Sequence, residues 1–416
     1  MSYAVSPKTQ ELLDKILSLD EVQKTLEFIK EDSENTLQNQ IDLVKIEAPT
    51  FHEEERAKAY AKYFEELGLE NVHLDQFGNT IGEKKGTGGG PKVLVEAHLD
   101  TVFPFGSVKD VRIENGIVYA PGICDDTRGL AVNLSVIRAL NHSGLKLKGD
   151  FLFAGSVEEE GLGGLSGVKK LLQANQDIEA SINIDGFEAT AITYQATGMR
   201  TCEANFYGIG GHAYGAFGTM ANPLHAAARA VAKIADIEVP EDPRTTFCVS
   251  NFHAGNDAGI HAIVQKATIK FNFRSNSMEE LNKLNDKIMQ ALQEACDEET
   301  KRWGKDTITF DYNVYVDVPA GDQDKHAPIV ESTYAIMKHY LGHEPIFNQG
   351  GSTNANNPIG AGIPAVCVGL GTTDNKVHSL EEFFPTENSH ELVQLTFLLA
   401  LMLGGIEGKT ESILNL

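Results

Sequence analysis

The segment 93–100 constrains the fold of this chain more than any other stretch. It reads Val-Leu-Val-Glu-Ala-His-Leu-Asp, which is typical of a short buried strand that ends in His98, with Asp100 two residues later. In open α/β sheets, ligands and metals are held at the carboxyl ends of the strands. A carboxylate beside the ring can fix the tautomer and orientation of a metal-binding histidine. A lone His-x-Asp is more often a local hydrogen bond, so a metal site requires support from the rest of the chain.

The same pattern recurs further along the chain. Apolar strands are predicted over residues 151–157, 181–184 and 363–369, and a paired aspartate precedes a helical pattern that begins near residue 127. The acidic or imidazole residues that follow these elements are Asp125, Glu158, Glu159, Asp185 and His378. Three consecutive glutamates are usually solvated, but here they lie at the mouth of an apolar strand, which disfavours that interpretation. We therefore expect these side chains to meet His98 at one edge of one sheet.

Length and periodicity predict two domains, because 416 residues exceed what one hydrophobic core usually organises. From residue 199 to residue 316 the order of elements reads βαββαβ, the ferredoxin-like unit. The expected fold is a mixed-sheet α/β/α catalytic domain formed by residues 1–198 and 317–416. An inserted ferredoxin-like domain over residues 199–316 would serve as a lid or dimerisation domain.

Composition narrows the possible partners and the compartment. A net charge of −24 argues against nucleic acid or an anionic membrane as a partner, because either would require a basic patch. The five cysteines show no paired spacing and indicate reduced thiols. The first residues lack the features of a signal peptide, and the apolar run 395–403 is far shorter than the ~20 residues of a membrane span. These features predict a cytoplasmic protein.

Carboxylates mixed with imidazoles, with no cysteine required, suit two divalent ions such as zinc, cobalt or manganese, with one carboxylate bridging them. Two such ions a few ångströms apart can ionise a water and polarise a carbonyl. Asp126 has a simpler interpretation, because it can cap the helix that follows. Cys124 is expected to be a small buried residue rather than a ligand.

With these residues in view, the chain resembles the co-catalytic zinc exopeptidases and amidohydrolases that include peptidase T, carboxypeptidase G and the aminoacylases. The resemblance covers nearly the whole chain. It rests on His98-Leu-Asp100, Gly122-Ile-Cys-Asp125-Asp126, Glu158-Glu159-x-Gly161, Asp185, Gly211-His212-Ala213, Arg274 and His378.

The resemblance implies a role for each matching residue. One metal ion would be bound by His98 and Asp185, the other by Glu159 and His378, and Asp125 would bridge them ahead of a cis peptide to Asp126. Glu158 would be the general base that takes a proton from the metal-bridging water, and Asp100 would orient His98. The nearby Glu160, Glu381 and Glu382 are expected to be solvated or to lie around the ligands.

In the family that the chain resembles, the inserted domain also forms a homodimer. His212 would reach into the partner's site and stabilise the oxyanion, and Arg274 would grip a substrate carboxylate. The chain departs from the family at His261, where asparagine is common, and at Asn354, where aspartate is common; both positions line the substrate pocket in the family. Thr127-Arg128 replaces the usual lysine after the paired aspartates.

The leading functional hypothesis is a metal-dependent peptidase that cleaves short peptides near a terminus. Deacylation of an N-acyl amino acid is an alternative, because the same site would hydrolyse that amide. A relative that binds metal without catalysis is a third possibility, although every expected ligand and the expected base are present. The sequence does not separate the first two.

Overall fold

The computed structural model describes residues 3–186, 188–304, 308–348, 350–369 and 375–416. Two compact units make up the chain. The first comprises residues 1–196 and 322–416, and the second comprises residues 197–321. The second unit is therefore an insertion between two parts of the first.

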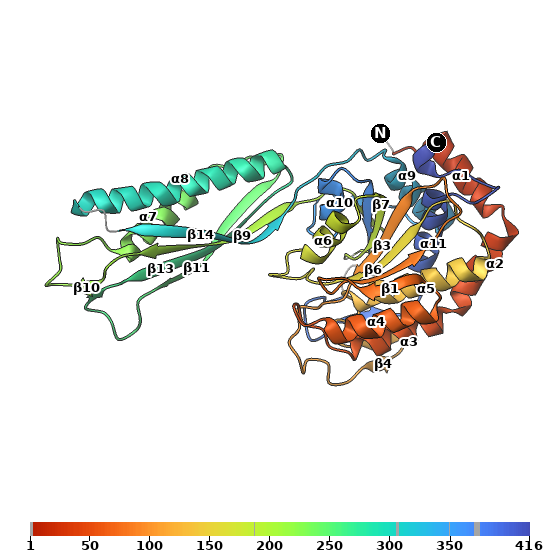
Figure 1. Ribbon diagram of the computed structural model, residues 1–416, viewed down its shortest axis with the longest axis horizontal. Helices are drawn as coiled ribbons and strands as arrows, with labels where there is room; N and C mark the ends of the chain where they lie inside the picture. The colour runs from red at the N-terminus through yellow and green to blue at the C-terminus, as the bar shows by residue number, and fades with distance from the viewer. Residues whose placement is uncertain (1–2, 187, 305–307, 349, 370–374) are drawn as a thin grey trace. The chain divides into compact units, whose positions relative to one another are not determined.

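The first unit is built on an eight-stranded mixed sheet (Figure 1). Its strands, in their order across the sheet, are β1 (Glu70–Leu74), β2 (Thr80–Lys84), β6 (Phe151–Ser156), β3 (Lys92–His98), β7 (Ile178–Ile184), β16 (Ala365–Val368), β8 (Ala191–Thr193) and β15 (Ile346–Asn348). The four central strands β6, β3, β7 and β16 are mutually parallel. A separate small sheet joins β17 (Phe383–Pro385), β5 (Ile117–Tyr119) and β4 (Arg112–Glu114).

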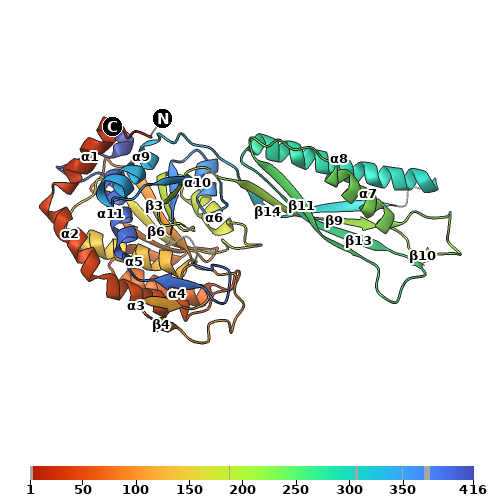
Figure 2. The same cartoon turned by 180° about the vertical axis from the view of Figure 1, so that it is seen from behind.

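Helices cover both faces of this sheet, which confirms the α/β/α prediction. Alternate residues of β3 face opposite layers: Val93 and Val95 pack into the main core, whereas Leu94 packs into a smaller cluster with Leu171 of α6. Figure 2 shows α5 and α11 on one side of the sheet and α6 on the other. The helices of this unit are α1 (Pro7–Leu17), α2 (Asp20–Glu31), α3 (Ser33–Val44), α4 (Glu54–Glu66), α5 (Thr127–Ser143), α6 (Ser166–Ala174), α9 (Pro328–Ala335) with the π-helix Ile336–Tyr340, α10 (Asn356–Gly360), α11 (His390–Gly404) and the 3-10 helix Ile413–Asn415.

Local sequence signals explain where the central helix α5 begins and ends. Asp126 is its N-cap, and the Asp126 carboxylate accepts a hydrogen bond from the Gly129 amide at 3.0 Å. Gly144 ends the helix in the left-handed conformation that glycine adopts without steric cost. The capping role predicted for Asp126 is confirmed, and Asp125 remains in the loop before the helix.

The inserted unit is a four-stranded antiparallel sheet with two helices packed on one face. The strand order is β11 (Thr245–Ala254), β13 (Lys266–Ser275), β9 (Gly198–Tyr207) and β14 (Thr309–Val318), and the helices are α7 (Pro223–Ala235) and α8 (Met278–Trp303). This arrangement is the predicted ferredoxin-like unit. A two-stranded ribbon of β10 (Gly211–His212) and β12 (Ala262–Ile263) is added to it.

Among the described residues, every helix is too short or too polar to cross a lipid bilayer.

Candidate metal centre

His98 is the last residue of the central strand β3, and its imidazole is held from both sides. The ring is 1% exposed, Nδ1 lies 2.9 Å from the Asp100 carbonyl oxygen and 3.4 Å from Asp100 Oδ1, and Nε2 lies 2.9 Å from Asp125 Oδ1. Burial alone would lower the pKa of His98, but hydrogen bonds to Asp100 and Asp125 raise it well above the usual value. A cation is therefore favoured at Nε2, whether a proton or a metal ion.

Asp100 connects the histidine to the loop that follows strand β6. Its carboxylate oxygens accept hydrogen bonds from the backbone amides of Glu159 at 3.0 Å and Glu160 at 2.9 Å, and from the Thr50 hydroxyl at 2.9 Å. Burial opposes ionisation of this carboxyl, yet His98 and the backbone amides of Glu160 and Glu159 lower its pKa. Asp100 thus fixes His98 and the glutamate loop together.

Asp125 lies between two histidines from distant parts of the sequence. Its Oδ1 is 2.9 Å from His98 Nε2, and its Oδ2 is 3.0 Å from His378 Nε2. The peptide bond to Asp126 is cis, as the family resemblance implied. A carboxylate that offers one oxygen to each of two imidazole-bearing sites has the geometry of a bridging ligand.

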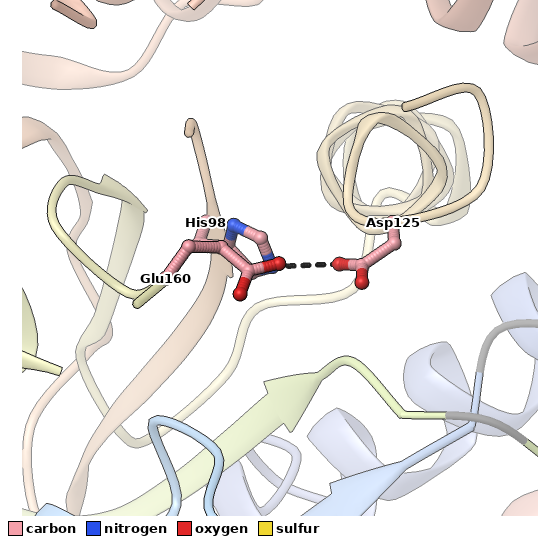
Figure 3. A group of neighbouring side chains, drawn as sticks. All are labelled: His98, Asp125 and Glu160. Atoms are coloured by element: carbon pink, nitrogen blue, oxygen red, sulfur yellow. Dashed lines mark hydrogen bonds and ion pairs between the residues drawn. The ribbon is translucent and has the colours of Figure 1, made fainter. Parts of the chain in front are cut away.

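The side chains of the three consecutive glutamates do not lie where the sequence-based roles would place them. Glu160, expected to be solvated or to lie around the ligands, lies with its Oε1 2.9 Å from His378 Nε2. With His98 and Asp125 it offers ligand atoms that all lie within 4.8 Å of one another (Figure 3). Glu158, expected to be the base, adopts a left-handed backbone with φ of 57° and directs its carboxylate to α6, where it contacts the Ser166 hydroxyl and Lys170 Nζ, the latter at 3.1 Å. The turn at Glu158 therefore directs Glu158 away from the histidines and Glu160 toward them.

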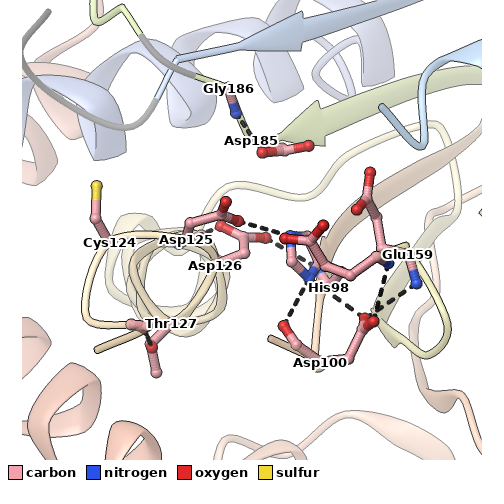
Figure 4. Close-up of polar contacts among 12 residues, drawn as sticks. His98, Asp100, Cys124, Asp125, Asp126, Thr127, Glu159, Asp185 and Gly186 are labelled. Carbon is pink, nitrogen blue, oxygen red and sulfur yellow. Dashed lines mark hydrogen bonds and ion pairs between the residues drawn. The ribbon is translucent and has the colours of Figure 1, made fainter. Parts of the chain in front are cut away.

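Two further acidic residues, Glu159 and Asp185, lie beside Asp125 and Glu160. Figure 4 shows Asp185 on the side of the group opposite Asp100. Burial, together with the negative charge of Asp125, raises the pKa of Asp185 to about 7. Burial also raises the pKa of Glu159 well above its usual value, and Asp185 and Glu160 add to this effect against the opposing influence of His98.

These carboxylates line a cleft of about 310 Å³ together with His378. Its acidic residues are Asp125, Glu159, Glu160, Asp185 and Glu188. The pKa values of Glu159 and Asp185 are raised mainly by burial and further by neighbouring carboxylates, and bound cations would offset both effects. The mixture of imidazole nitrogen and carboxylate oxygen suits zinc or a similar transition metal better than calcium or magnesium. The residues present therefore fit a pair of divalent ions.

Asn354, predicted to contact substrate, is buried in the first unit. It is 1% exposed, and its side-chain amide donates to Glu96 Oε2 at 3.1 Å and to Ser156 Oγ at 2.9 Å. Strand β3 directs Glu96 and Leu94 toward the same layer, so the amide of Asn354 partners a buried carboxyl. The role predicted for Asn354 came from its place in a sequence motif. In the structure its amide group is hydrogen-bonded to Glu96 and Ser156.

The predicted oxyanion residue His212 and the predicted substrate residues His261 and Arg274 lie in the inserted unit and are solvent-exposed. His212, in β10, accepts hydrogen bonds at Nδ1 from the amides of Tyr214 at 3.3 Å and Gly215 at 3.2 Å. The His261 carbonyl accepts from the Ala213 amide at 2.8 Å, which places the two histidines on one ribbon. Arg274 lies on the polar face of β13, and its Nε donates to Asn272 Oδ1 at 3.2 Å.

Comparison with known proteins agrees with this architecture. The model of peptidase family M20/M25/M40 matches residues 94–402. Protein YqjE of Bacillus subtilis (strain 168) is 26% identical over 364 residues, which cover 84% of this chain and 93% of that protein. Succinyl-diaminopimelate desuccinylase of Nitrosospira multiformis is 25% identical over 350 residues, covering 79% of this chain and 86% of the enzyme.

Solved structures show the same fold. Aminopeptidase PepT from Bacillus cereus ATCC 10987 superposes with a TM-score of 0.72 at 24% identity, covering 88% of this chain and 97% of that chain. The Bacillus subtilis YXEP protein, described as a dinuclear metal-binding peptidase of family M20, gives 0.67 at 16% identity, covering 90% and 99% respectively. The family match spans both the metal-binding segments and the inserted unit, and the chain therefore belongs to peptidase family M20/M25/M40, a family of hydrolases.

Proposed function

We propose that this protein is an exopeptidase that hydrolyses short peptides with the help of two divalent metal ions, which we take to be zinc. The observation that carries the proposal is the position of Asp125, whose two carboxylate oxygens lie 2.9 and 3.0 Å from His98 and His378. A single carboxylate shared by two imidazole sites supports two ions rather than one.

In this proposal the ligand set follows the contacts of His98, Asp125, Glu160 and His378, and Asp185 is added because it lines the same cleft. His98 and Asp185 would hold one ion, Glu160 and His378 the other, and Asp125 would bridge them. Glu160 replaces Glu159 of the earlier assignment because Glu160 lies 2.9 Å from His378.

Glu159 then becomes the proposed general base. Its carboxyl lines the cleft, where a carboxylate beside a metal-bound water can act as a general base. When bound, the two ions would lower the pKa of an attacking water and polarise the scissile carbonyl. Glu159 would accept the proton of that water at its carboxylate and pass it to the departing amine nitrogen. Asp100 would hold the Glu159 backbone in place through its hydrogen bond to the Glu159 amide.

The inserted unit would supply further groups to the reaction. We propose that it forms the dimer contact, that His212 stabilises the oxyanion in the partner's site and that Arg274 binds a substrate carboxylate. Both side chains are exposed, and Arg274 presents a planar guanidinium suited to a carboxylate. His261, next to His212 on the ribbon, would contribute to the same surface.

Deacylation of N-acyl amino acids is a second candidate, favoured by the similarity to succinyl-diaminopimelate desuccinylase over 79% of the chain. Both substrate classes present an amide near a carboxylate, so the proposed centre would accept either.

A substrate panel separates the two candidates. The protein would be loaded with zinc, cobalt or manganese and assayed against dipeptides, tripeptides, N-acetyl, N-succinyl and N-aminobenzoyl amino acids. We expect release of free amino acids from the peptides. Cleavage confined to the acyl compounds would replace the peptidase assignment with a deacylase, and absence of turnover with both ions bound would indicate a non-catalytic relative.

A further inference from the structure

Glu382 lies in the main unit beneath the loop that carries Asp125. The residue is fully buried, with 0% of its surface exposed. Its Oε1 accepts hydrogen bonds from the backbone amides of Cys124 at 2.8 Å and Asp125 at 2.9 Å, and its Oε2 accepts one from the Gly122 amide at 3.0 Å. One carboxylate thus receives three amide donors from a single loop.

The loop is shaped so that its amides converge on an acceptor. Gly122 has a left-handed φ of 74°, and a Cβ at this position would lie 2.9 Å from Thr101 Cγ2. Successive amides around a left-handed residue form a concavity that binds anions. Buried amides without an acceptor are costly, so the Glu382 carboxylate is part of what holds this loop in its conformation.

The segment that carries Glu382 also carries His378, four residues earlier. The Glu382 carbonyl accepts from the Ala120 amide at 3.2 Å, and the next residue, Phe383, pairs with Tyr119 in the small sheet. The same segment therefore contacts Asp125 at two points: His378 meets its side-chain Oδ2 at 3.0 Å, and Glu382 meets its backbone amide at 2.9 Å.

From these contacts we propose that Glu382 is a positioning residue that sets Asp125 against His378. It would act on the ion held by His378 and Glu160 more than on the ion held by His98, because Asp100 fixes His98 independently. This inference rests on the proposed function, since it requires a centre of two metal ions. Glu382 touches neither substrate nor the reacting atoms.

Glu381 provides a matched control. It is the adjacent residue with the same side chain, but that side chain is 75% exposed and pairs with Lys376 Nζ at 2.6 Å. Glu381→Gln therefore changes charge and composition identically to Glu382→Gln without touching the Asp125 loop.

The test is a metal titration of the full-length protein after removal of metal by a chelator. Wild type, Glu381→Gln and Glu382→Gln would be titrated with Co²⁺ and followed by calorimetry and visible absorption, with circular dichroism as a check of folding. We expect two bound ions in wild type and Glu381→Gln. In Glu382→Gln the first ion should bind as in wild type and the second about 10- to 100-fold more weakly, the usual effect of losing a partner that supports metal ligands.

Activity provides a second readout. Because the defect would lie in occupancy, excess metal should restore the kcat of Glu382→Gln toward that of Glu381→Gln, which damage to the fold would not allow. If Glu382→Gln does not fold, Glu382→Asp retains the charge but shortens the reach, and the same selective weakening is expected.

The outcomes separate the two proposals. A wild-type protein that binds fewer than two ions contradicts the proposed function itself. A wild-type protein with two ions, beside a Glu382 variant that binds both equally well or loses both equally, contradicts only the role of Glu382.

Discussion

His98 and His378 contact opposite oxygens of the same carboxylate but lie in different surroundings. The His98 side chain is 1% exposed and ends a central strand, whereas the His378 side chain is 48% exposed and lies in a loop with a left-handed φ of 63°. Hydrogen bonds to Asp125 and Glu160 raise the pKa of His378 to about 10 despite partial burial. One side of the centre, at His98, is therefore part of the central sheet, whereas the other side, at His378, is formed by a loop.

The largest expected effect is on catalysis, and it distinguishes Glu159 from Glu160, the residue that contacts the partly exposed His378. Glu159→Gln should retain both ions but lower kcat by about 10²- to 10⁴-fold, the range for loss of a general base. Glu160→Gln should lose the ion at His378, and Glu158→Gln should behave almost as wild type because Glu158 faces Lys170. Steady-state kinetics with metal analysis checks this. Full activity in Glu159→Gln, or its loss in Glu158→Gln, would restore Glu158 as the base.

The two histidines should differ in their effect on folding. His98→Ala in the metal-free protein should lower the free energy of unfolding by about 3–5 kcal/mol, because it removes the buried cation from Asp100 and one of the two imidazole partners from Asp125. His378→Ala should cost less than about 1 kcal/mol, because the side chain is half exposed and solvent screens its ion pairs. Urea denaturation measures both values. Equal losses of unfolding free energy in the two variants would contradict the distinction between His98, which ends a sheet strand, and His378, which lies in a loop.

Metal exchange should follow the same asymmetry. The ion at His378 should dissociate first, with an affinity about 10- to 100-fold weaker than that of the ion at His98, because only His98 has Asp100 as a supporting partner. Stepwise dialysis against a chelator, with metal content and activity measured at each step, should pass through a species with one ion. Simultaneous loss of both ions would contradict this order.

A further test concerns the pH dependence of stability. Burial raises the pKa of Asp185 and of Glu96 to about 7, so the native protein holds protons that the unfolded chain releases near pH 4. The stability that these protonated carboxyls provide is complete below about pH 4 and is lost as pH rises through about 7, at no more than ~1.4 kcal/mol per pH unit for each carboxyl. Urea denaturation of metal-free protein between pH 4 and 7 should show this fall. Asp185→Asn should reduce the slope of the free energy of unfolding against pH by the contribution of one carboxyl. An unchanged slope would show that Asp185 does not contribute to the pH dependence.

Much of the architecture could be predicted from the sequence. Strand ends are signalled by apolar runs such as 93–98 and 181–184, and the alternation of Ile269, Phe271 and Phe273 marks a half-buried strand. Because the central strands are parallel, their carboxyl ends had to meet at one edge, which is why His98 and Asp185 could be grouped before any coordinates.

The finer assignments depend on backbone conformation, which the sequence does not reveal. Three consecutive glutamates are chemically identical, and only the left-handed turn at Glu158 decides that Glu160 faces His378. The role of Glu382 depends on three amides that converge from a distant loop, and Asn354 depends on a partner, Glu96, that lies far away in the sequence. Such long-range contacts leave no periodic signal in the chain.

The most direct test of the central claim is a crystal structure of the zinc-loaded protein with anomalous diffraction at the zinc edge. We predict two peaks, one bonded to His98 and one to His378 at about 2.0–2.1 Å, with one Asp125 oxygen on each. A single peak, or two peaks of which only one contacts Asp125, would contradict the bridged centre.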